Sequence, residues 1–218
     1  MKKLYVLLAS LLLVVFISAC GEGTQTTQNN KPTVGGSDEG VTAMQAWEKV
    51  KPEADKWSSS YKIASISEDT SGGFQRIDGK AIGWEFYLEE CTEEYDSSSL
   101  AGLCKKGKTK KFSYRCDKQK VTALEEQSMT SGRNTFSVDE FKIDSDKAQD
   151  IARKEAGVDK IDSEEFVMRA DSVNDVPCWE VRRQCYYKAD DDECSKEDNY
   201  FMYVNITTGE AYEDKSDL

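Results

Sequence analysis

Apolar residues recur along the chain with two spacings, which predict helices in some stretches and strands in others. Residues 42–57 place apolar side chains three or four positions apart, as on one face of a helix: Ala43, Ala46, Trp47, Val50, Ala54 and Trp57. Residues 61–67 and 81–90 read as strands, the second with Trp84, Phe86 and Leu88 at alternate positions. Asp78-Gly79 between them is a hairpin signal. A further strand is predicted at residues 111–117.

The same order of patterns returns in the second half of the chain. Asp144 offers an N-cap for a helix at residues 147–156, and Gly157 is typical of a helix end. Strands are predicted at residues 165–170, 178–187 and 200–206. The second half therefore predicts one helix followed by strands, as the first half does.

Alignment of Trp84 with Trp179 indicates that the two stretches are copies of one unit. Each tryptophan is followed by a glutamate and an apolar residue, then by a cysteine, a polar loop, a second cysteine and an aromatic strand. We expect an α+β fold of two tandem units, residues 42–126 and 140–215, each with one helix packed on a small antiparallel sheet. The two sheets could be separate or form one continuous sheet.

This order of elements resembles the PepSY-type domain, and the second copy resembles it more closely. The resemblance lies in Ala148, Ala152 and Gly157 in the helix, Trp179-Glu180-Val181 in the central strand, and Tyr203-Val204-Asn205 with Thr208-Gly209-Glu210 at the end. In the first copy, Asp117-Lys118-Gln119-Lys120 replaces the usual closing motif. The resemblance implies an antiparallel sheet with a helix on one face, and a role in extracytoplasmic binding or peptidase inhibition.

The N-terminus is typical of an exported protein. Lys2 and Lys3 precede an apolar run at residues 4–17, and at about 14 residues this run is short of the roughly 20 that a membrane span needs. Ile17-Ser18-Ala19-Cys20 resembles the lipobox of prokaryotic lipoproteins, which implies cleavage after residue 19 and lipid attachment at Cys20. An ordinary signal peptide and an uncleaved anchor remain alternatives. Residues 20–41 are polar and predict a flexible tether.

Six further cysteines in an exported chain predict disulfide bonds: Cys91, Cys104, Cys116, Cys178, Cys185 and Cys194. The repeat favours Cys91–Cys104 and Cys185–Cys194, which bracket the polar loop of each copy. Cys116–Cys178 then remains as a bond between the units. Pairing of Cys91 with Cys116 is the alternative.

Composition narrows the function classes. The net charge is −12, and the only basic run, residues 105–111, is expected to be a solvated loop, so we expect no nucleic-acid partner. The chain has no histidine, which excludes Ser-His-Asp and Cys-His catalysis, and no phosphate-binding motif is present. The acidic run at residues 190–193 is expected to be a solvated loop tip, so we expect neither a metal nor a cofactor. Asn205-Ile206-Thr207 is a glycosylation sequon.

These observations predict a lipoprotein at the extracytoplasmic face of the cell membrane that acts as a protein-binding module and is not an enzyme. An inhibitor or regulator of an extracytoplasmic peptidase is the alternative. A carboxylate-dependent hydrolase is the least favoured class.

Overall fold

A computed structural model of the chain describes residues 40–69, 79–94, 103–130, 132, 134–157, 165–184 and 200–218. Helices and strands follow one another in two similar series. The elements, with η for 3-10 helices, are α1 (Ala43–Trp57), β1 (Lys62–Glu68), β2 (Gly83–Glu94), β3 (Cys104–Arg115), β4 (Lys120–Ala123), β5 (Gln127–Met129), η3 (Val138–Glu140), α2 (Ser145–Glu155), β6 (Glu165–Val173), β7 (Val176–Gln184), β8 (Tyr200–Asn205), β9 (Ala211–Tyr212) and η5 (Lys215–Asp217).

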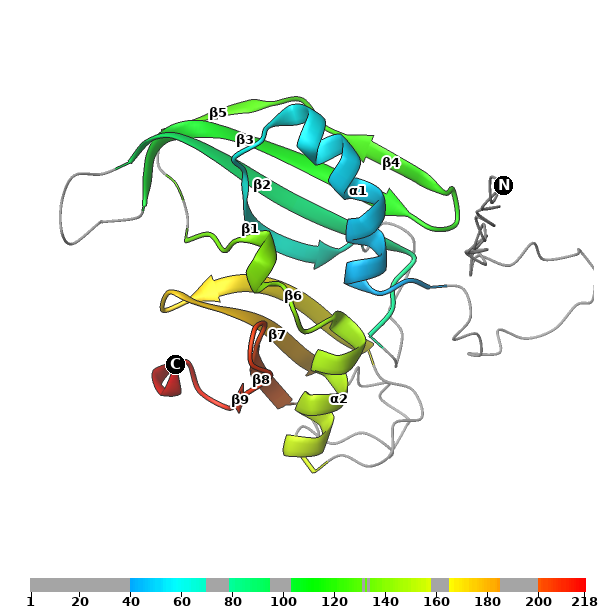
Figure 1. Ribbon diagram of the computed structural model, residues 1–218. Coiled ribbons are helices and arrows are strands. Elements are labelled where there is room, and N and C mark those ends of the chain that lie inside the picture. The colour runs from blue at the N-terminus through cyan, green and yellow to red at the C-terminus, as the bar shows by residue number, and fades with distance from the viewer. Residues whose placement is uncertain are drawn as a thin grey trace, which may run out of the picture.

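The strands of the described residues all belong to one antiparallel sheet of nine strands in the order β4-β3-β2-β1-β6-β7-β8-β9, with β5 also paired to β3. The sheet is continuous because β1 pairs with β6, through Ile66 opposite Ala170 and Ser67 opposite Arg169. Helix α1 lies over the first part of the sheet and α2 over the second (Figure 1). The mixed helix-and-sheet fold that the sequence predicts is therefore present, as one continuous sheet.

The first turn of each helix explains where it begins. At α1, the Thr42 hydroxyl accepts a hydrogen bond from the Gln45 N–H at 3.3 Å, and the Gln45 side chain accepts one from the Thr42 N–H at 3.1 Å. This reciprocal arrangement satisfies two N–H groups that have no partner within the helix. At α2, the Asp144 carboxylate accepts from the Ser145 N–H at 2.7 Å. The predicted N-cap is thus confirmed, and the helix starts two residues before the predicted position.

The two parts of the sheet use the same register around their central tryptophans. Trp84 of β2 lies opposite Tyr114 of β3, and Trp179 of β7 lies opposite Val204 of β8. Each indole N–H donates to the carbonyl just before a helix N-cap: Trp84 to Val41 at 2.8 Å, and Trp179 to Ile143 at 2.7 Å. Both hydrogen bonds are buried, so each tryptophan fixes the start of its helix on its own strands.

A single apolar core joins the two parts. Trp84 and Trp179 are both fully buried, and their rings meet edge to face with centroids 6.0 Å apart. In the first part, Trp47 of α1 packs on Phe86 at 5.2 Å between centroids. Residues from both helices and most strands belong to the same buried cluster. The halves therefore share one hydrophobic interior.

The basic run at residues 105–111 is part of strand β3, so the prediction of a solvated loop is wrong. Its lysines face an acidic stretch of β2: Glu90 lies opposite Lys108, and Glu93 opposite Lys106. Lys105 also forms an ion pair with Glu93 at 2.5 Å. Opposite charges on facing strands stabilise pairing that a run of like charge would otherwise oppose. The β2–β3 hairpin is consequently longer than the predicted strands.

The predicted Cys91–Cys104 disulfide is confirmed, with Cα atoms 5.5 Å apart and a separation of 13 positions in sequence. It joins Cys91 of β2 to Cys104, the first residue of β3, at the end of the hairpin where β2 stops and β3 begins. The bond therefore holds together the part of the hairpin in which charged residues are frequent and apolar residues are few.

The predicted Cys116–Cys178 bond is wrong, because the structure does not join these two buried residues. Cys116 directly follows β3 and Cys178 lies in β7, with β2, β1 and β6 between the two strands. Four strand spacings amount to about 19 Å along the sheet, whereas a disulfide needs Cα atoms within about 7 Å. Cys185 and Cys194 lie outside the described residues.

Candidate functional site

The edge of the sheet at β4 and β5 contains an irregularity that the sequence did not predict. Ala123 lies opposite Phe112 of β3, and Gln127 lies opposite Thr109. The two edge residues are four positions apart, whereas their partners on β3 are three positions apart. The edge therefore contains one extra residue, which forms a β-bulge at residues 124–126. The Leu124 N–H still donates to the Lys111 carbonyl at 2.9 Å. A bulge of this kind bends an edge strand and changes the direction of its side chains.

The bulge leaves Leu124 exposed to solvent. Its relative exposure is 51%, and it is the large apolar residue that stands out as exposed among the described residues. On β2, Trp84, Phe86 and Leu88 point to the core, so the intervening Glu85 and Tyr87 point to the face of the sheet opposite the helices. Leu124 therefore stands beside a sheet face that no described helix covers.

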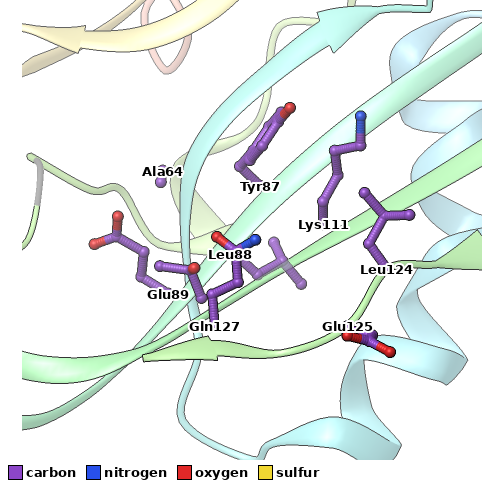
Figure 2. A pocket seen from close by; sticks show the side chains of 9 residues that line it. Ala64, Tyr87, Leu88, Glu89, Lys111, Leu124, Glu125 and Gln127 are labelled. Carbon is purple, nitrogen blue, oxygen red and sulfur yellow. The ribbon is translucent and has the colours of Figure 1, made fainter. Parts of the chain in front are cut away.

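A groove of about 320 Å³ lies between the bulge and this face of β2 and β3 (Figure 2). Tyr87 and Lys111 extend side by side from the two neighbouring strands, and Leu124 stands beside them at the edge (Figure 2). The residues that line the groove are Ala64, Tyr87, Leu88, Glu89, Thr109, Lys111, Leu124, Glu125 and Gln127. The groove thus combines apolar, aromatic and charged side chains from four strands and the bulge.

Lys111 is held in place by two neighbours. Its ammonium lies 2.6 Å from a Glu85 carboxylate oxygen and 5.4 Å from the centre of the Tyr87 ring. Burial by itself lowers the pKa of Lys111, but the hydrogen bond and the charge of Glu85 outweigh this effect and raise the pKa above its usual value. Lys111 is therefore a fixed cation and does not serve as a general base at neutral pH.

A related arrangement is found on the same face of the second part of the sheet. Arg182 of β7 lies 4.7 Å from the ring centre of Phe201 on β8, and 3.3 Å from Glu180. Arg182 and Phe201 are opposite each other, as Tyr87 and Lys111 are. In the first part the aromatic ring lies on β2 and the cation on β3, whereas in the second part the cation lies on β7 and the aromatic ring on β8. Cation, ring and glutamate therefore form a packed set on the helix-free face in both parts.

The bulge has no counterpart at the other edge of the sheet. Strand β9 pairs with β8 through Ala211 opposite Val204, which corresponds to Val121 opposite Tyr114 at the first edge. After Tyr212 the described chain turns into η5. The groove therefore depends on residues 124–127, which follow β4 and have no equivalent after β9.

None of the sequence-predicted site residues within the described ranges lines this groove. Cys20, Cys185 and Cys194 are outside the described residues. Asn205 ends β8, and its side-chain oxygen accepts hydrogen bonds from the N–H groups of Thr207 at 2.8 Å and Thr208 at 3.0 Å. The Thr207 hydroxyl donates to the Glu140 carbonyl at 2.9 Å. The sequon residues thus stabilise a turn, and glycosylation of Asn205 stays a prediction.

The groove residues carry no motif, so the sequence patterns missed them. The nearest signal is Leu124 itself, an apolar residue between two short polar stretches. The described residues hold no grouping of acidic or cysteine side chains suited to a metal ion. Of the helices in the described part of the chain, none has the length and apolar character that a bilayer crossing requires.

Comparison with known proteins identifies no family. No protein-family model and no curated protein matches the chain. Among solved structures, a predicted lipoprotein from Clostridium difficile 630 is similar, with 12% sequence identity and a TM-score of 0.43. The match covers 77% of this chain and 90% of that protein. The resemblance to PepSY-type domains therefore rests on the residues quoted above.

Proposed function

We propose that the chain is an extracytoplasmic lipoprotein that binds a protein partner through the groove beside Leu124. The observation that carries the proposal is the bulge at residues 124–126, which exposes a leucine at the edge of a groove on the helix-free face. Mixed apolar and polar linings are typical of sites that bind side chains of a partner. A lipid anchor would display this groove at the membrane surface.

Photo-crosslinking tests the binding proposal. The photoreactive residue p-benzoylphenylalanine replaces Leu124 in the full chain, expressed in its native membrane, and replaces exposed Glu213 in a control. We expect a protein adduct of defined mass from position 124 and none from position 213, which lies beyond the opposite edge of the sheet. The same adduct from both positions, or none from either, would contradict binding at the groove.

The anchor is proposed at Cys20, on the strength of the Ile17-Ser18-Ala19-Cys20 motif after a short apolar run. Two acyl chains give stable membrane attachment, whereas one gives marginal attachment. Intact-mass analysis of the membrane-bound protein should find a chain that starts at Cys20 and carries a diacylglyceryl group. The Cys20→Ala variant should stay uncleaved or leave the membrane. An unmodified Cys20 on mature, membrane-bound protein would refute the anchor.

We also propose that the fold consists of two copies of one unit. Three sets of equivalent residues meet each other between the copies: Ser67 lies opposite Arg169, Trp84 contacts Trp179, and the N-cap side chains of Thr42 and Asp144 are hydrogen-bonded. Contacts between equivalent residues are the mark of a two-fold arrangement. The matched tryptophan hydrogen bonds support the same proposal.

Regulation of an extracytoplasmic peptidase is the second candidate. The feature that favours it is the β2–β3 hairpin, which the Cys91–Cys104 disulfide holds in one conformation. Structures that are ordered before binding lose less entropy when they occupy a peptidase cleft. Inhibition assays with membrane peptidases, with the reduced protein as control, should show loss of inhibition after reduction. Equal inhibition by the oxidised and reduced protein would show that the disulfide-bonded hairpin does not cause the inhibition.

A further inference from the structure

The groove beside Leu124 has a charge pattern that selects among peptide ligands. Three charged side chains line it: Glu89, Lys111 and Glu125. The ammonium of Lys111 is already paired with Glu85 at 2.6 Å, so its charge is largely balanced within the sheet. Glu89 is buried, whereas Glu125 is exposed to solvent in the bulge. The solvent side of the groove therefore has an acidic character.

The rest of the protein increases this preference. The net charge of −12 repels anionic ligands and attracts cationic ones as they approach. Rim charges such as Glu125 act mainly on the rate of association and on the choice of partner. A segment with a lysine or arginine therefore complements the groove, and an acidic segment does not.

The apolar lining sets the second requirement. Leu124 stands at the edge, Lys111 stands between it and the Tyr87 ring, and Ala64 of β1 is buried. At about 320 Å³ the groove is at the lower end of the roughly 300–1,000 Å³ range of ligand sites, so it suits one or two side chains and not a large molecule. An aliphatic side chain fits this lining, because it buries apolar surface against Leu124 and the methylene stem of Lys111.

We propose that the groove binds an extended segment of a partner protein that presents an aliphatic side chain next to a lysine or arginine. The aliphatic side chain packs on Leu124 and on the methylene stem of Lys111, which stands between Leu124 and Tyr87, and the cation lies at Glu125. Each chain binds one such segment, because the bulge has no equivalent after β9. This inference rests on the proposed function and names the chemistry of its partner.

Fluorescence anisotropy with three labelled peptides tests the inference. The peptides are Gly-Lys-Leu-Lys-Leu-Gly, its acidic analogue Gly-Glu-Leu-Glu-Leu-Gly, and Gly-Lys-Ser-Lys-Ser-Gly, which lacks the aliphatic side chains. Each is titrated with the full chain in non-ionic detergent. We expect the first peptide to bind at least about tenfold more tightly than either analogue, with one peptide per chain.

Two variants and two matched controls locate the site. Leu124→Ser and Glu125→Lys should each weaken binding of the first peptide roughly five- to tenfold, through loss of apolar contact and reversal of the rim charge. The matched controls are Ala123→Ser and Glu213→Lys. Ala123→Ser also introduces a serine at an exposed edge position, and Glu213→Lys also reverses a charge, beyond the opposite edge of the sheet. Neither residue lines the groove. The controls should leave the affinity within about twofold of the original.

The outcomes separate the inference from the proposed function. Equal binding of the acidic peptide, no binding of any peptide, or equal weakening by Glu213→Lys would overturn the basic-aliphatic ligand. Two bound peptides per chain would overturn the single groove. If the crosslink at position 124 forms while these peptides fail to bind, the partner has other chemistry and the binding function stands. If the crosslink fails too, both proposals fail.

Discussion

Two turn residues in the left-handed backbone region show how single side chains affect this fold. Gln119 has φ +46°, and Gly209 has φ +80°. Tyr114 pairs with Trp84, and Val204 pairs with Trp179. Gln119 and Gly209 each follow one of these partners by five residues, in the turn that leads to the next strand. Glycine adopts this conformation without steric cost, whereas other L-residues are strained by about 1–2 kcal/mol. The first turn therefore has a strained glutamine where the second has a glycine.

Replacement of Gln119 by glycine should stabilise the protein. The relief of strain exceeds the added chain entropy of glycine in the unfolded state, so we expect the free energy of unfolding to rise by about 0.5–1 kcal/mol. The reciprocal variant, Gly209→Ala, should lower it by about 1 kcal/mol or more, since the new Cβ would also lie 3.3 Å from Ile151 Cδ1. Urea denaturation measures both. A loss of stability in Gln119→Gly would contradict the strain.

Asp144 connects the starts of both helices. Its carboxylate accepts hydrogen bonds from the N–H of Ser145 at 2.7 Å and from the N–H of Met44 in α1 at 2.9 Å. The neighbouring Ser145 hydroxyl accepts from the Ala43 N–H and donates to the Gly79 carbonyl. Burial raises the pKa of Asp144 above 3.8, and the hydrogen bonds from Thr42, Met44 and Ser145 oppose this only in part. The side chain thus serves as a cap that is shared between the two helices.

Asp144 variants should separate its hydrogen bonds from its charge. Asp144→Ala should lower the free energy of unfolding by about 1–2 kcal/mol, because helix caps are lost. Asp144→Asn keeps a good cap. Because the folded pKa is raised, the contribution of Asp144 is fully present below the unfolded pKa near 3.8 and declines as pH rises through the folded pKa. The stability of the original relative to Asp144→Asn should therefore fall from pH 3.5 to pH 7. Urea denaturation at both pH values measures this difference. A relative stability that rises between pH 3.5 and pH 7 would contradict the raised pKa of Asp144.

At the scale of elements, the β2–β3 hairpin depends on ion pairs and one disulfide at its far end. Lys105 pairs with Glu93, and Cys91 is bonded to Cys104. Exposed ion pairs contribute little, typically under about 1 kcal/mol each. A disulfide that closes a loop of similar length contributes about 3 kcal/mol in the chain-entropy model. The disulfide is therefore the main stabilising link in this part of the hairpin.

Removal of that disulfide should destabilise the protein by about 2–3 kcal/mol. The double variant Cys91→Ser/Cys104→Ser removes the bond, and chemical denaturation measures the change. The variant Lys105→Ala breaks the adjacent ion pair and serves as the comparison, with an expected loss of less than about 1 kcal/mol. Similar losses in both would show that the charged ladder, and not the covalent bond, holds the hairpin.

At the scale of the whole molecule, the two parts form one cooperative unit. The sheet runs without interruption from β4 to β9, the rings of Trp84 and Trp179 are in contact, and Asp144 binds the start of α1. Neither part can keep these contacts when the other unfolds. We therefore expect thermal unfolding in a single transition, with equal calorimetric and van't Hoff enthalpies. Differential scanning calorimetry measures both, and two separate transitions would contradict a shared core.

The elements that depend on residues close together in the chain could be predicted from the amino-acid sequence. Both α-helices, the central tryptophan strands and the Cys91–Cys104 bond follow from local periodicity, capping residues and the repeated spacing. The buried positions of Trp47, Trp84 and Trp179 follow in the same way. These features are predictable because the interactions that select them join residues that are close together in the chain.

The tertiary structure alone decided which strands become neighbours, and with that the candidate site. Pairing of β1 with β6 placed Cys116 and Cys178 too far apart to bond. Pairing with acidic β2 turned the lysine run into a strand. The bulge that exposes Leu124 arises because Ala123 and Gln127, which are four residues apart, pair with β3 residues that are only three residues apart. Register between strands depends on contacts distant in sequence, so no local pattern records it.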